Sequence, residues 1–87
     1  MSADLAAKLL TLLTLAEVWL KMRAYDDLAL AHSEMVHLLD LPLPSIEMDF
    51  FKLLNQAKIW RLKEDAGNIQ RCHAEMRALL EGVTSHG

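Results

Sequence analysis

Apolar side chains recur at helical spacing in four stretches of the chain. In the first stretch they occupy positions 5, 9, 12, 16 and 19, and in the second they occupy positions 28, 31, 35 and 38. Intervals of three and four residues place such side chains on one face of an α-helix. The pattern returns twice after segment 40–44. We therefore predict an all-α fold of four helices, at about 4–22, 26–39, 45–63 and 66–82, arranged as two antiparallel hairpins.

The second half of the chain repeats the first. When the sequence is shifted by 41 positions, Trp19 falls on Trp60, and the run His-x-Glu-Met that starts at His32 falls on the same run at His73. The shift also superposes Leu12 on Leu53, Leu13 on Leu54, Ala16 on Ala57, Leu38 on Leu79 and Leu39 on Leu80. A repeated hairpin cannot bury its apolar face alone. We predict one domain, 1–87, with a first repeat at about 4–41, a linker at 40–44 and a second repeat at about 45–83.

Residues that begin or interrupt helices flank the predicted elements. Asp26 and Ser45 are the predicted N-caps of the second and third helices, because their side-chain oxygens can accept hydrogen bonds from first-turn amides. Pro42 and Pro44 lie in the linker. Proline lacks a backbone N–H and restricts the residue before it, so we predict that the linker is not helical.

Each predicted hairpin resembles a tetratricopeptide-type repeat. Segment 21–29 looks like the usual turn of these repeats, and residues of the expected size fall close to the family's positions at Leu12, Leu15, Ala16, Trp19, Tyr25, Ala29 and Pro42. The resemblance implies helix–turn–helix units that bind proteins. By the same likeness of fold, the chain resembles small bacterial chaperones that hold an aggregation-prone helical subunit in type III secretion, which implies a chaperone or adaptor role.

The first and last predicted helices differ in their apolar faces. The helix at 66–82 is amphipathic and needs one neighbouring surface. The helix at 4–22 is apolar over most of its circumference, and we expect Leu9, Leu12, Ala16 and Trp19 to face the second helix. The remaining apolar residues have no evident internal partner: Leu10, Leu13, Leu15, Val18 and Leu20. Either this strip binds a partner or a second copy, or the first helix is covered on several sides in a closed bundle.

Charge and composition exclude several classes of protein. The chain carries 12 acidic and 9 basic side chains, with a net charge of −3, whereas nucleic-acid binding requires clustered lysine and arginine. The most apolar stretch, 5–20, contains Lys8 and Glu17 and is shorter than the about 20 apolar residues of a membrane span. The acidic start at Asp4 does not suit a secretory signal. We expect a cytoplasmic protein without a membrane span or a nucleic-acid partner.

Few residues could carry chemistry. His32 and His73 occupy equivalent positions, and we interpret them as packing residues at the rim of the hairpin interface. A metal site is the alternative, but a histidine and a glutamate two residues apart point to different sides of a helix. Cys72, the single cysteine, lies on an apolar stripe, which is typical of a buried small hydrophobic residue. We expect no cofactor, no metal, no small-molecule substrate and no catalysis, and hence not an enzyme.

These observations favour a non-catalytic protein interaction module. We expect the first helix to present its apolar strip to a helical segment of another protein. The predicted contact residues are Leu10, Leu13, Glu17, Leu20 and Lys21 on the first helix, with Lys58 and Arg61 in the equivalent region of the third. The alternative is an obligate homodimer in which the first helix forms the two-fold interface.

Overall fold

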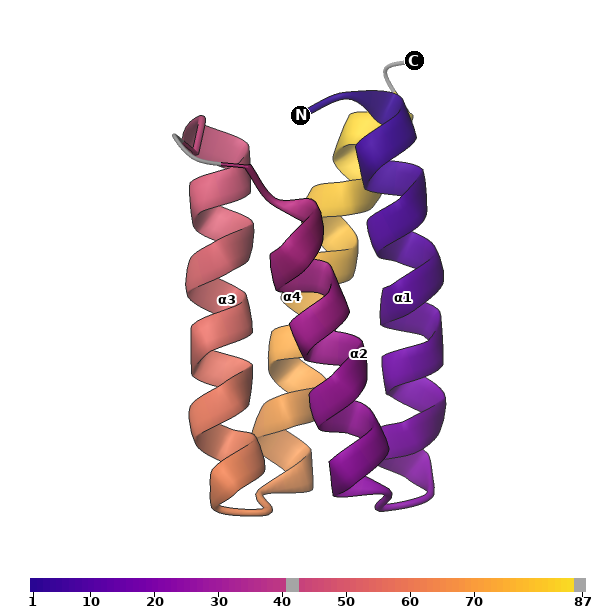
Figure 1. Cartoon of the computed structure of the whole chain (residues 1–87), viewed down its shortest axis with the longest axis vertical. Helices are drawn as coiled ribbons and strands as arrows, with labels where there is room; N and C mark the ends of the chain where they lie inside the picture. Colours follow the sequence, from indigo (N-terminus) through magenta and orange to yellow (C-terminus); the bar gives the residue numbers. More distant parts are fainter. Residues whose placement is uncertain (41–42, 86–87) are drawn as a thin grey trace.

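The computed structural model describes residues 1–40 and 43–85, which form four helices (Figure 1). These are α1 (Ala3–Lys21), α2 (Tyr25–Leu38), α3 (Ser45–Leu62) and α4 (Ala66–Thr84). Each predicted helix matches to within two residues, and the predicted all-α fold of two hairpins is confirmed. Leu41 and Pro42, which belong to the predicted linker, lie outside the described residues, and Asp40, Leu43 and Pro44 are not helical.

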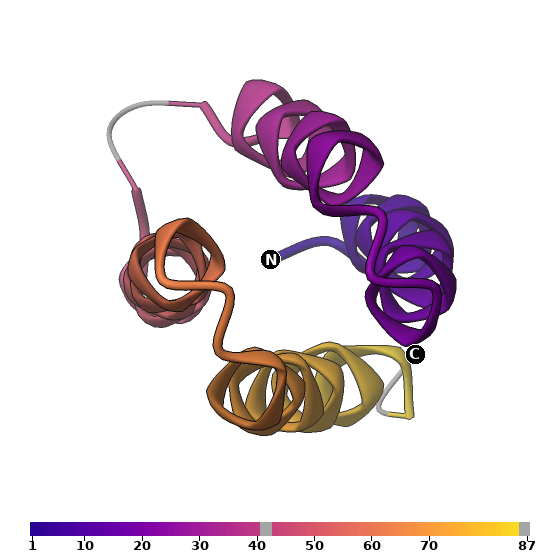
Figure 2. The same cartoon turned by 90° about the horizontal axis from the view of Figure 1, so that it is seen from below.

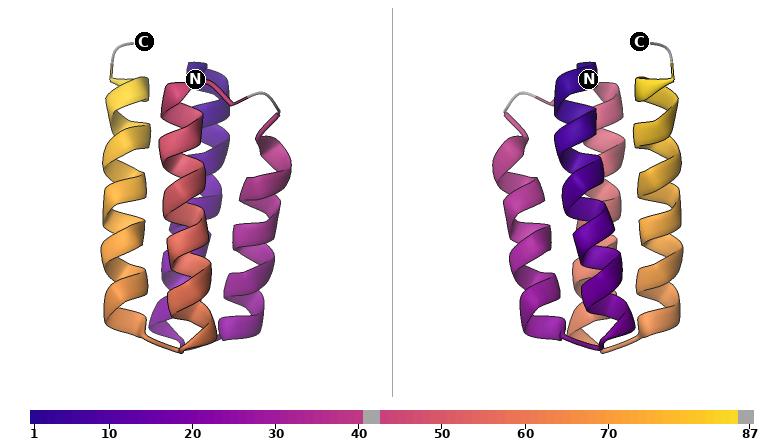
Figure 3. Two further views of the ribbon diagram at one scale, coloured as in Figure 1. Left: turned by 90° about the vertical axis from the view of Figure 1, so that its left-hand side faces the viewer. Right: turned by 90° about the vertical axis from the view of Figure 1, so that its right-hand side faces the viewer.

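The four helices form a ring in which each neighbour runs antiparallel to the next (Figure 2). α1 packs against α2 within the first hairpin and against α4 of the second, while α3 packs closely on α4 and only loosely on α2. The side views show that α1 lies opposite α3, with α2 and α4 on either side of them (Figure 3). The hairpins therefore close as a bundle, which was one of the two arrangements that the sequence left open.

The core is built from equivalent positions of the two repeats. Buried residues of α1 and α2 are matched by buried residues 41 positions later on α3 and α4. The pairs in which both residues are apolar are Leu9 and Phe50, Leu13 and Leu54, Ala16 and Ala57, Leu28 and Ile69, Ala31 and Cys72, and Met35 and Met76. Cys72 is buried, as its place on an apolar stripe predicts. Each hairpin supplies half of one core that neither could form alone.

The expectation that α1 exposes its apolar strip is wrong for Leu13 and Leu20. Leu13 is 0% exposed and Leu20 is 5% exposed. α4 packs on the flank of α1 that carries these residues, so α1 is covered on two sides. Leu10 is partly buried against the same core, whereas Leu15 and Val18 remain exposed on the outer face of α1.

Both hairpins turn through the same backbone conformation. Arg23 and Glu64 occupy equivalent positions and have positive φ angles of 56° and 53°. The following amides close the turn in the same way, since Ala24 N donates to Trp19 O and Asp65 N donates to Trp60 O, both at 2.9 Å. This left-handed residue after the helix stops it and satisfies carbonyls that the helix leaves unpaired. The repeat thus extends from the sequence to the backbone of the turns.

The helix caps differ from those predicted. Asp26 lies in the first turn of α2, after an N-cap at Ala24, and Ser45 is the first residue of α3, after an N-cap at Pro44. Neither N-cap makes a side-chain hydrogen bond. Asp26 still carries negative charge where the helix dipole favours it. The side-chain cap in the second hairpin is Asp65, whose Oδ1 accepts a hydrogen bond from Asn68 N at 3.2 Å.

Glu64→Gly should stabilise the fold. A left-handed backbone conformation destabilises a residue with a Cβ by about 1–2 kcal/mol, and glycine avoids this cost. Glycine is also more flexible in the unfolded chain, which offsets part of the gain. We expect a net gain of about 0.5–1 kcal/mol in the free energy of unfolding, measured by urea denaturation. Arg23→Gly is the matched control and should gain less, because the Arg23 guanidinium donates to Leu20 O at 2.6 Å. A loss of stability in Glu64→Gly would contradict this account of the turn.

Candidate functional site

Two histidines meet in the centre of the bundle. His32 comes from α2 and His73 from α4, two helices that face each other across the ring. Their Nε2 atoms lie 2.9 Å apart, and the rings are edge to face with centroids 5.2 Å apart. The side chains are 4% and 1% exposed. The sequence identified the two positions as equivalent, but it placed them at the rim, whereas they form a direct contact between the hairpins.

Both histidines are held in the neutral form. Burial lowers the pKa of His32 to about 3, helped by the nearby His73 and Arg61. Burial likewise lowers the pKa of His73 to about 4. With both rings neutral, the Nε2–H of one donates to the Nε2 of the other, so the accepting ring carries its proton on Nδ1. Neither Nδ1 atom has a hydrogen-bond partner among the residues that the structure describes, so this contact joins the hairpins at some cost.

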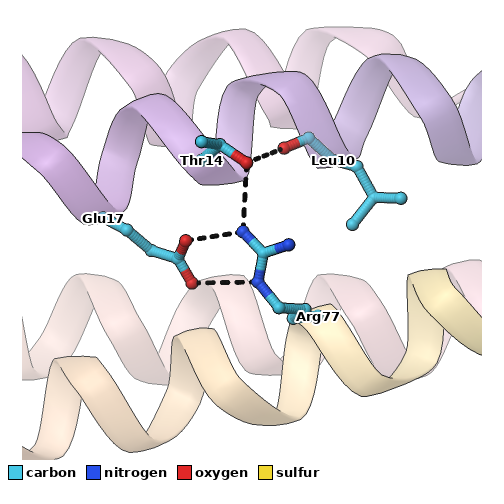
Figure 4. A network of polar contacts seen from close by, with 4 residues as sticks. All are labelled: Leu10, Thr14, Glu17 and Arg77. Atoms are coloured by element: carbon cyan, nitrogen blue, oxygen red, sulfur yellow. Dashed lines mark hydrogen bonds and ion pairs between the residues drawn. The ribbon is translucent and has the colours of Figure 1, made fainter.

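The interface between α1 and α4, here called the α1–α4 seam, is locked by one arginine (Figure 4). Arg77 Nε and Nη2 donate to the two carboxylate oxygens of Glu17, at 3.2 and 2.5 Å. Nη2 also donates to the hydroxyl of Thr14 at 3.0 Å, and that hydroxyl donates to Leu10 O at 2.9 Å. A two-pronged guanidinium–carboxylate pair is among the stronger and more directional polar contacts in proteins. It fixes α4 against the flank of α1.

The interface between α2 and α3, the α2–α3 seam, has no such lock. By the repeat, Lys58 stands where Glu17 stands in the other seam, and Val36 stands where Arg77 stands. A valine cannot donate a hydrogen bond, and among the described residues no side-chain hydrogen bond or ion pair joins α2 to α3. The two helices also make the loosest contact of any neighbouring pair in the ring.

A groove of about 250 Å³ runs along this open seam. Its floor is His32 and Leu54, and its walls are Ala29, Ser33 and Val36 from α2 and Asn55, Lys58 and Arg61 from α3. We call it the α2–α3 groove. Exposed and half-buried apolar side chains continue from it along the same flank of α3, in steps of three or four residues that include Asn55 and Lys58: Met48, Phe51 and Leu62.

A larger hollow of about 700 Å³ lies beside the lock of the α1–α4 seam. Two of its charged residues, Glu17 and Arg77, pair with each other, and Arg23 donates to the carbonyl of Leu20, whereas Lys21 is exposed and makes no ion pair within the described residues. In the α2–α3 groove, neither Lys58 nor Arg61 is within ion-pair distance of a carboxylate in the part of the chain that the structure describes. The lining of the smaller groove thus carries two cations and no carboxylate.

The predicted contact residues separate into two groups. Leu13 and Leu20 are in the core, Leu10 is partly buried, Glu17 is paired with Arg77, and Lys21 is exposed. Lys58 and Arg61, in contrast, both line the α2–α3 groove. Sequence reasoning missed Val36, although the comparison of position 36 with position 77 could have shown that one seam lacks an arginine.

Comparison with protein-family models, with curated proteins and with solved structures found no match to this chain. None of the four helices in the described residues is both long enough and apolar enough to cross a membrane. Nor does any group of three or more histidine, cysteine, aspartate or glutamate side chains gather, within those residues, where it could hold a metal ion.

The histidine pair makes the stability of the fold depend on pH. In the unfolded chain both rings have a pKa of about 6.5, so below that pH the unfolded state takes up protons that the folded state does not. The free energy of unfolding is therefore unaffected by protonation of these rings above a pH of about 6.5. Below that pH it falls by about 1.4 kcal/mol per pH unit for each ring, until the pH reaches the pKa of that ring in the folded state.

Urea denaturation between pH 7.5 and pH 4.5 measures this loss. The variant His32→Leu should show about half of the pH slope, because one of the two rings is gone. His37→Gln removes an exposed histidine of the same helix and serves as the control, with the slope of the parent protein. A flat stability between pH 7 and pH 5 would contradict a neutral buried pair.

Removal of the lock should weaken the α1–α4 seam. Glu17→Gln keeps the shape of the side chain but removes its charge, and we expect a loss of about 1 kcal/mol for this partly exposed pair, with faster hydrogen exchange in the middle of α4. Lys8→Gln breaks the exposed pair with Asp4 and should change neither measurement. Equal effects of the two substitutions would show that the Arg77 contact is an ordinary surface pair.

Proposed function

We propose that this protein is a non-catalytic interaction module that binds a helical segment of a partner protein in the α2–α3 groove. The observation that carries the proposal is the difference between the two seams. Arg77 ties α4 to α1 through Glu17, whereas Val36 and Lys58 leave the equivalent positions of α2 and α3 unconnected. A seam that lacks internal polar contacts can accept a further surface without losing any of them.

The comparison of the two seams also moves the proposed contact surface from α1 to α3. Leu10, Leu13, Glu17 and Leu20 of α1 are covered by α4, so the need for a neighbour that the sequence indicated is met within the chain. The equivalent flank of α3, which carries Lys58 and Arg61, is covered only loosely by α2. A partner helix would extend the covering of α3, in the way that amphipathic helices commonly dock in grooves between helices.

The dimensions of the groove favour a helix over a small molecule. At about 250 Å³ it is smaller than the roughly 300–1,000 Å³ of most small-molecule pockets. It is also continuous with apolar side chains at helical spacing, of which Met48 and Leu62 are exposed and Phe51 is half-buried. A chaperone or adaptor role, as the resemblance in fold implies, is compatible with a groove of this kind, in a protein that its composition leads us to expect in the cytoplasm.

Self-association through the outer face of α1 is the second candidate. Leu15 and Val18 on that helix, and Met22 directly after it, remain exposed after α2 and α4 have covered its other faces. A two-fold dimer of this chain would bury these residues against their own copies. Sedimentation equilibrium of the purified protein tests this candidate directly, because a dimer that Val18→Asp dissociates would favour it.

Two matched substitutions test the proposed docking site. Val36 lines the groove and is 37% exposed, while Val18 lies on the outer face of α1 and is 45% exposed. Peptides selected from a phage-displayed library of 16-residue helix-forming sequences should bind the parent protein. Their affinity should fall about tenfold or more in Val36→Asp, because a carboxylate is desolvated beneath the docked helix, and should be unchanged in Val18→Asp.

Circular dichroism checks that both variants are folded, which is expected because neither valine belongs to the buried core. The proposal is wrong if the selected peptides bind Val36→Asp as well as the parent protein, or if the selection gives no peptide that the parent protein binds. Peptides that lose affinity only in Val18→Asp would transfer the docking site to the outer face of α1.

A further inference from the structure

We infer that the helix bound in the α2–α3 groove is acidic and places an aspartate or glutamate between Lys58 and Arg61. This inference rests on the proposed function and specifies the chemistry of the partner. It starts from the two cations that line the groove and from the absence of a carboxylate beside them in the described residues.

The repeat shows what Lys58 lacks. Its equivalent, Glu17, is neutralised by Arg77 across the α1–α4 seam. In the α2–α3 seam the charge at this position is reversed, and the residue opposite is Val36, which offers no anion. The carboxylates that α2 does carry belong to Asp26, Asp27 and Glu34, and none of them is within ion-pair distance of Lys58. The α2–α3 seam thus contains the cation of an interhelical ion pair without the anion.

Arg61 adds a second, partly buried cation to the same place. Burial lowers the pKa of this guanidinium, because partial removal of water makes its charged form less favourable. A partly desolvated cation gains most from a carboxylate, since the attraction between opposite charges strengthens as water is excluded. The floor of the groove beneath it, His32, is neutral and offers no compensating charge.

Charge also discriminates among the possible occupants. A second copy that docked groove to groove would set Lys58 and Arg61 against the same residues of its partner, and like charges oppose such an interface. A basic helix meets the same repulsion. A helix with apolar residues on one face can cover Val36 and Leu62, and a carboxylate beside that face can reach the two cations.

The test uses the peptides selected on the parent protein from a library in which glutamate, lysine and glutamine are equally frequent at the polar positions. We expect the peptides whose binding depends on Val36 to be enriched in glutamate next to the apolar stripe. Replacing that glutamate by glutamine in a synthetic peptide should weaken binding about tenfold, and raising the salt concentration from 0.05 to 0.5 M should weaken the glutamate peptide more than the glutamine one.

Charge reversal on the protein gives the matched control. Lys58→Glu should weaken the glutamate peptide about tenfold or more and should restore tight binding to the same peptide with lysine in place of glutamate. Lys52→Glu makes the same change on an exposed residue of α3 that does not line the groove, and it should have no effect on either peptide.

The outcomes separate this inference from the proposed function. If the peptides that depend on Val36 are neutral or basic, or if Lys58→Glu binds the glutamate peptide as well as the parent protein does, the acidic partner is wrong while the docking groove stands. If no selected peptide depends on Val36, the groove itself is not the docking site, and the inference fails with it.

Discussion

Each hairpin of this protein presents an apolar face that only the other hairpin can cover, and this constraint organises the rest of the structure. Leu13 and Leu54, or Met35 and Met76, are buried because the two repeats face each other around the bundle axis. The contact between His32 and His73 connects α2 and α4, two helices that otherwise face each other across the ring. Stability is therefore a property of the pair of hairpins, and separate hairpins are not expected to persist.

The two seams between the hairpins are held together by different kinds of contact. In the α1–α4 seam, Arg77, Glu17 and Thr14 supply directional contacts that hold the helices at one distance. In the α2–α3 seam, Val36 and Lys58 form no such contact, so the two helices are held against each other by packing. Where packing is the only restraint, helices separate at lower cost and local openings are expected first. Function is therefore best sought on the side of α2 and α3.

The sequence was sufficient for the helices and their pairing, because helical periodicity and the repeat are local signals. Trp19 and Trp60, and the run shared by His32 and His73, are enough to identify the two hairpins from the sequence alone. It was not sufficient for the burial of Leu13 and Leu20, because periodicity shows that a helix has a second apolar flank but not which helix covers it. The place of the histidine pair depended on closure of the ring, which no local pattern encodes. Lys58 and Arg61 were identified by equivalence to α1, but the absence of an arginine at Val36 became meaningful only when the two seams could be compared.

The duplication within one chain has a consequence for how such a bundle can diversify. Two identical hairpins from separate chains would present the same residue in both seams, so any change at the position of Glu17 would occur twice. Here positions 17 and 58 are encoded separately, and one holds an anion while the other holds a cation. Because the two repeats lie in one chain, the residues of the α2–α3 seam can differ from those that hold the α1–α4 seam together. Substitutions can accumulate on α3 while the lock on α1 keeps the scaffold intact.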